Sequence, residues 1–165
     1  MLEHRYIKTF TMIIAAVMTL VANGALAIEY KLGAIRIEDP WIRATPNGAE
    51  VAAGYLSIRN TGTTPDRLVG GSADIASRFE MHEMKMDGDV AKMRQLKGID
   101  IKPGETIEFK PGASHVMFVG LNRQLERGEN VKGTLFFERA GSIEIEYAVE
   151  PLGAQSRSHR SEDMH

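Results

Sequence analysis

Short apolar runs separated by glycine- and proline-rich turns restrict the fold of this chain more than any other feature. Many of the runs alternate apolar and polar residues, which is typical of strands with one buried face. Their nearly regular spacing predicts an all-β sandwich or barrel of about seven to nine antiparallel strands. We expect Gly70-Gly71 to interrupt the pattern after Leu68-Val69. The expected strands cover residues 31–37, 51–59, 78–86, 90–96, 105–110, 114–121, 129–138 and 142–149.

The first 27 residues have the features of a secretory signal peptide. Arg5 and Lys8 carry positive charge, residues 11–21 form an apolar run, and residues 25–27 (Ala-Leu-Ala) form a small-x-small cleavage site. The alternative is a retained anchor, because the uncharged stretch 9–28 approaches the length of a membrane span. Asn23-Gly24 interrupts that stretch, so we favour cleavage and expect no membrane span afterwards. The expected organisation is a signal peptide at 1–27, one domain at 28–152 and a disordered polar tail at 153–165.

Charge and cysteine content narrow the function. The formal net charge is −2, and no basic stripe is present, which argues against a nucleic-acid partner. The chain has no cysteine, so it has no disulfide, no thiolate ligand and no thiol nucleophile. Neither a nucleophile–base pair nor a cluster of carboxylates stands out, so we expect a protein that is not an enzyme.

Histidine and methionine gather in one window, residues 80–117. Ten residues separate His82 from Met93, and twenty-one separate Met93 from His115. One residue separates His115 from Met117. In a strand, residues two apart share a face and lie about 7 Å apart along the backbone, so His115 and Met117 can bind one ion. His82 and Met93 lie on two sides of a predicted hairpin and can meet across it.

The chemistry of these side chains favours Cu(I). Thioether sulfur is soft and neutral, and imidazole binds copper in either oxidation state. Two methionines and two histidines form an uncharged set that can release Cu(I) to thiolates, which suits a carrier. An electron carrier is disfavoured because blue-copper sites use a cysteine. Methionine is often core filler, however, and Met81, Met84 and Met86 exceed what one ion needs. We interpret these three as a surrounding shell or packing, with Met84 and Met86 better placed for auxiliary contact.

The spacing of His82, Met93, His115 and Met117 resembles that of the periplasmic PCu(A)C copper chaperones. The resemblance implies a cupredoxin-like Greek-key β-sandwich that lacks the cupredoxin cysteine. It also implies that those four side chains bind one Cu(I) and that the protein delivers it to the Cu(A) site of cytochrome c oxidase. The implied partners are oxidase subunit II and a second periplasmic copper chaperone. Segments 39–44, 55–60, 66–68, 93–94, 101–104 and 115–121 carry the same resemblance in the same order.

The sequence leaves two points open, the recipient of the copper and the role of the tail. A periplasmic copper-buffering or resistance protein without a dedicated recipient would need the same four ligands. The tail carries His159, Met164 and His165, and it resembles the His/Met-rich C-terminal extension with which some family members bind Cu(II). A solvated tail with incidental histidines explains these residues equally well. Trp41 and Tyr55 are interpreted as core or rim aromatics.

Overall fold

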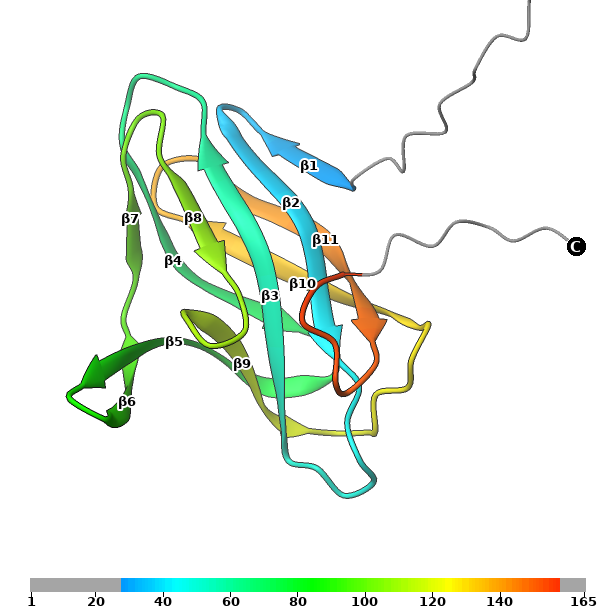
Figure 1. Cartoon of the computed structure of the whole chain (residues 1–165). Helices are drawn as coiled ribbons and strands as arrows, with labels where there is room; N and C mark the ends of the chain where they lie inside the picture. Colours follow the sequence, from blue (N-terminus) through cyan, green and yellow to red (C-terminus); the bar gives the residue numbers. More distant parts are fainter. Residues whose placement is uncertain (1–27, 158–165) are drawn as a thin grey trace, which may run out of the picture.

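Residues 28–157, which the computed structural model describes, form one curled sheet of eleven strands that folds into two layers (Figure 1). The all-β sandwich prediction is confirmed. Within these residues there is no helix long and apolar enough to cross a membrane. The predicted signal peptide lies outside the described residues. The strands are β1 (Glu29–Leu32), β2 (Ile35–Arg43), β3 (Val51–Asn60), β4 (Asp66–Ala73), β5 (Ala76–Asp87), β6 (Val90–Leu96), β7 (Ile99–Ile101), β8 (Thr106–Phe109), β9 (His115–Leu121), β10 (Asn130–Phe137) and β11 (Gly141–Glu150).

The strand order is β6-β5-β9-β3-β2-β11-β10-β4-β7, with β1 added to β2 and β8 added to β3. The predicted number of strands was too low, and the expectation of purely antiparallel pairing was wrong. β11 pairs with β2 in parallel, and Ala148 lies opposite Trp41. The predicted strand over 31–37 is also divided in two, because the chain reverses at Gly33, whose φ of 57° lies in the left-handed region that glycine adopts readily.

The predicted break at Gly70-Gly71 was wrong for a reason of packing. β4 continues through both glycines and pairs with β10. A Cβ atom on Gly71 would lie 2.8 Å from the Phe79 ring and 2.8 Å from the backbone oxygen of Thr134. Glycine therefore allows Phe79 to approach the β4 backbone closely and does not end the strand.

The pairing of β5 with β9 fixes the relative position of the two strands that carry His82 and His115. On the core side, Phe79 lies opposite Phe118, and Met81 lies opposite Val116. The Phe79 and Phe118 rings meet edge to face with centroids 5.7 Å apart, and Phe118 makes a similar contact with Tyr147 at 5.3 Å. Phe118 is fully buried. These apolar pairs hold the register, because a shift of one residue would turn them out of the core.

β5 is longer than the part of β9 that it pairs with. Its last partner on β9 is His115, opposite His82, and beyond this point β5 pairs with β6 alone. We call residues 83–94 the arm. In Figure 1 the arm projects from the sandwich, and β6 is an edge strand of the sheet. β9 therefore begins at the point where the arm leaves the sandwich, while β5 continues past it.

The segment that follows β11 lies against β2. The Nε atom of Arg43 donates a hydrogen bond to the carbonyl oxygen of Ala154 at 3.0 Å, and Arg157 lies 3.6 Å from the carboxylate of Asp39. The histidines and methionine of the predicted tail lie outside the described residues. The tail boundary at residue 153 and its binding of Cu(II) stay predictions.

We expect Phe118→Ala to lower the free energy of unfolding by about 3–5 kcal/mol, because it leaves a cavity in the core beside Phe79 and Tyr147. Urea unfolding followed by circular dichroism measures this change as a lower midpoint. The matched control is Phe136→Ala, since Phe136 is 40% exposed. That control should cost about 1 kcal/mol or less. Equal losses in the two variants would contradict the assignment of Phe118 to the core.

Candidate metal centre

His82 and His115 are direct cross-strand partners on β5 and β9. Their imidazole rings stack with centroids 5.7 Å apart and planes inclined by 16°. Both side chains point away from the core, because their neighbours Met81 and Val116 point into it. The structure therefore brings the two predicted histidine ligands together on the outer face of the sheet.

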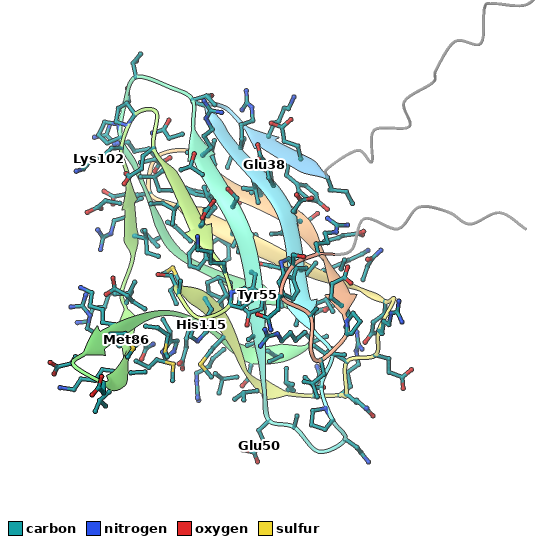
Figure 2. All side chains as sticks on the ribbon, viewed as in Figure 1. Glu38, Glu50, Tyr55, Met86, Lys102 and His115 are labelled. Atoms are coloured by element: carbon teal, nitrogen blue, oxygen red, sulfur yellow. The ribbon has the colours of Figure 1, made fainter. Side chains whose placement is uncertain are left out.

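Met117 and Met93 lie on the same face, on either side of this pair. Met117 is two residues from His115 on β9 and lies opposite Glu80. Met93, on β6, lies opposite Met84 of β5. Met93 is therefore the diagonal neighbour of His82 across the β5–β6 pair. Met117 thus occupies the sandwich side of the centre, and Met93 occupies the arm side. Figure 2 shows His115 at the base of the arm and Met86 toward its end.

Hydrogen bonds determine which imidazole nitrogens can bind a metal. Nε2 of His82 lies 2.9 Å from Oε2 of Glu80, and Nδ1 of His115 lies 3.2 Å from the carbonyl oxygen of Ala113. Ionised carboxylates and carbonyls only accept hydrogen bonds, so each of these nitrogens carries its ring hydrogen. In the neutral rings, Nδ1 of His82 and Nε2 of His115 are left with free lone pairs. Nδ1 of His82 is buried and has no hydrogen-bond partner, so a metal ion would satisfy it.

Glu80 is a functional candidate that the sequence interpretation missed. Its hydrogen bond with His82 is the main cause that lowers the pKa of Glu80, and Arg78 contributes through an ion pair at 3.2 Å. A carboxylate that holds the ring hydrogen of a metal-binding histidine fixes the orientation of the ring and makes its other nitrogen more basic. The signal was present in the sequence, because Glu80 lies two residues from His82 and therefore shares its face of the strand.

The donors differ in exposure. The His82 side chain is 12% exposed, whereas Met93 is 54% exposed. An ion at this centre would be bound on its buried side by imidazole, and a second protein would approach it from the solvent side, past the Met93 thioether. Met81 is 3% exposed and belongs to the core, so it is packing and does not face the site. Met84 and Met86 lie on the same face as His82.

Neighbouring residues have structural contacts. Trp41 and Tyr55 are buried, with ring centroids 4.4 Å apart, and the Arg43 guanidinium lies 5.4 Å from the Tyr55 ring centre. Burial raises the pKa of Tyr55, and the positive charge of Arg43 opposes this rise. Arg94 forms an ion pair with Glu83 at 3.0 Å on the face of the arm opposite the histidines. These contacts explain the aromatic and arginine residues without a role at the metal.

The donor set fits a soft ion. In residues 28–157 there is no group of three or more His, Cys, Asp or Glu side chains that could hold a metal ion. The candidate centre has two imidazoles, and its other candidate donors are thioethers. Such a set favours Cu(I) and offers little to Zn(II), Ca(II) or Mg(II).

Comparison with known proteins identifies the family. Residues 35–149 match the family described as "Putative lipoprotein LpqE-like". The PCuAC domain of PmoF2, solved in a copper-bound form, is 31% identical over 75% of this chain and 98% of its own, with a TM-score of 0.65. This chain belongs to the LpqE-like/PCuAC domain family. The apo form of the PmoF2 domain is 30% identical over 79% of this chain and 100% of its own, with a TM-score of 0.67.

Two further proteins extend the comparison. The solution structure of "CuI-DR1885" from Deinococcus radiodurans shares the fold with a TM-score of 0.59 at 23% identity, covering 74% of this chain and 80% of its own. The "Putative lipoprotein Lxx21020" of Leifsonia xyli is 27% identical over 76% of this chain and 75% of its own. The predicted resemblance to the PCu(A)C family is confirmed.

In this PCuAC domain we expect Glu80→Ala to weaken Cu(I) binding by about 10–100-fold, because the His82 ring loses the carboxylate that orients it. Competition with a chromogenic Cu(I) chelator under reducing conditions measures the change. Glu83→Ala is the matched control, since Glu83 is the residue on the opposite face of β5 three positions further on. Glu80→Gln should recover part of the affinity, because an amide oxygen can still accept the ring hydrogen. Equal affinities for Glu80→Ala and Glu83→Ala would contradict the role of Glu80.

Proposed function

We propose that this protein is a copper metallochaperone that binds one Cu(I) through His82, Met93, His115 and Met117. The observation that carries the proposal is the stacked pair of outward-facing imidazoles, at 5.7 Å, flanked on one face by the two thioethers. The copper-bound PCuAC domain of PmoF2 supports copper as the cargo. Thioethers and neutral imidazoles bind copper without losing a proton, so binding at neutral histidines releases no protons.

The second part of the proposal is delivery. The cargo goes to an oxidase copper site, the Cu(A) site of subunit II, and a second periplasmic copper chaperone acts with this protein. A neutral thioether and imidazole set loses Cu(I) to thiolate ligands, and the exposure of Met93 gives a recipient access to the ion. No catalytic step is part of this function. The alternative is a copper-buffering or resistance protein, which would hold the ion at the same centre without a recipient.

The place of action is the periplasm. The signal-like residues 1–27 and the description of the family as putative lipoproteins support a location outside the cytoplasm. Thiolate ligands would be lost to disulfides in an oxidising compartment, whereas thioethers persist there. A chain without cysteine that binds copper through methionine and histidine is suited to that chemistry.

X-ray absorption of the Cu(I)-loaded protein should show both sulfur and nitrogen scatterers. Met117→Leu should lose part of the sulfur contribution, because leucine keeps the volume of methionine but has no donor atom. Met81→Leu is the control, since Met81 lies in the core, and it should leave the spectrum unchanged. A wild-type spectrum without sulfur would overturn the ligand assignment.

Mixing the Cu(I)-loaded protein with an apo oxidase Cu(A) domain under reducing conditions should move copper to that domain. The physical reason is the stronger binding of Cu(I) by thiolate than by thioether. Separation of the two proteins followed by metal analysis measures the transfer. A recipient with its cysteines replaced by serine is the control and should receive little copper. If copper stays with this protein in both mixtures, buffering is the better account.

A further inference from the structure

The two faces of the arm differ in chemistry. On one face the side chains form ion pairs: Glu83 contacts Arg94 at 3.0 Å and Lys85 at 3.4 Å, and Lys92 contacts Asp87. The other face carries Met84, Met86 and Met93, and it has Ala91 opposite Met86. The methionine face is the same face that carries His82. The arm therefore extends the metal centre outward with thioethers alone.

The three methionines are close enough to share one ion. Met84 and Met93 are direct cross-strand partners, which places their Cβ atoms about 5 Å apart. Met86 is two residues further along the same face of β5, at one diagonal position from Met93. A methionine side chain has three rotatable bonds, so the three sulfur atoms can converge over the arm.

Packing does not explain the side chains at the outer end of this face. Met86 is 68% exposed, and Met93 is also more than half exposed. Neither belongs to the hydrophobic core, in contrast to Met81 on the opposite face of the same strand. Three methionines on one face of a hairpin whose other face is charged form an apolar surface with a soft donor at each position.

We propose that Met84, Met86 and Met93 form a second Cu(I) position, which we call the thioether station. The inference rests on the proposed function, since the cargo is the same ion. The station shares Met93 with the histidine centre, so the two positions hold one ion in turn. Movement outward breaks the bonds from copper to His82, His115 and Met117 and forms bonds to Met84 and Met86. All these ligands are neutral, and copper stays Cu(I), so neither a proton nor an electron is transferred.

The geometry gives the station a place in the path of the ion. His82 is much less exposed than Met93, and Met86 lies toward the outer end of the arm (Figure 2). The station offers no imidazole, so it holds Cu(I) less tightly than the histidine centre does. An ion at the station is exposed to an incoming thiolate while it is still bound to the chaperone. The station is therefore the point at which the recipient takes over the ion.

The test removes the histidine centre and leaves the station. In a His82→Ala/His115→Ala variant, we expect one weakly bound equivalent of Cu(I), with sulfur as the protein scatterer in its X-ray absorption spectrum. Adding Met84→Leu and Met86→Leu to this variant should abolish that binding, whereas adding Met81→Leu should not. All the replaced side chains except Met81 lie outside the hydrophobic core, so we expect each variant to fold. Circular dichroism checks this.

Three results would overturn the station. One is a histidine-free variant that binds no Cu(I) while the wild type binds it, which leaves the proposed function intact. Another is sulfur-only binding that survives Met84→Leu and Met86→Leu. The third is a wild type that binds no Cu(I) at all, which would overturn the proposed function as well. The three results are distinguishable in one competition titration series.

A second measurement uses the wild-type protein with its methionine methyl groups labelled with carbon-13. On addition of one equivalent of Cu(I), the methyl signals of Met84 and Met86 should shift or broaden together with those of Met93 and Met117. The Met81 signal is the internal control and should stay in place. Unchanged Met84 and Met86 signals would contradict occupation of the station.

Discussion

The register between β5 and β9 is the constraint on which the rest of the site depends. Phe79 with Phe118, and Met81 with Val116, form paired apolar contacts on the core side of these two strands. The residues between them point outward at matched heights, so the same register aligns His82 with His115 and Glu80 with Met117. A shift of one residue would bury the imidazoles and expose the aromatic rings. The hydrophobic core therefore determines where the donors lie, although it contains none of the proposed ligands.

Much of this arrangement could be predicted from the sequence. β6 has the predicted bounds, and β5 and β9 differ from prediction by one or two residues at their ends. The alternation of apolar and polar residues was enough to predict these strands. Its period of two also places His82, Met84 and Met86 on one face. The errors arose where distant residues decide. Gly71 accepts the Phe79 ring from another strand, and the parallel contact of β11 with β2 joins segments about a hundred residues apart.

The sequence was also silent on the state of the imidazoles. Which ring nitrogen of His82 carries hydrogen depends on the position of a carboxylate, and for His115 it depends on a backbone carbonyl. These contacts become visible only when the strands are assembled. They leave each of the two candidate histidines with one defined free nitrogen, and they place Glu80 where it would orient the His82 ring. The two imidazoles are thus held by hydrogen bonds, whereas Met86 and Met93 on the arm are exposed thioethers.

The long extension of β5 beyond β9 has a consequence for dynamics. Met93 lies on an edge strand whose ladder partner is β5 alone, whereas His115 and Met117 lie on a strand paired on both sides. Edge hairpins outside the core open with a smaller free energy than the body of the domain. A copper ion at the histidine centre would act as a cross-link between the arm and the sandwich, and it would raise the free energy of opening the arm. Loss of the ion would return the arm to its own weaker cooperativity, so the order of this hairpin would report whether the protein is loaded.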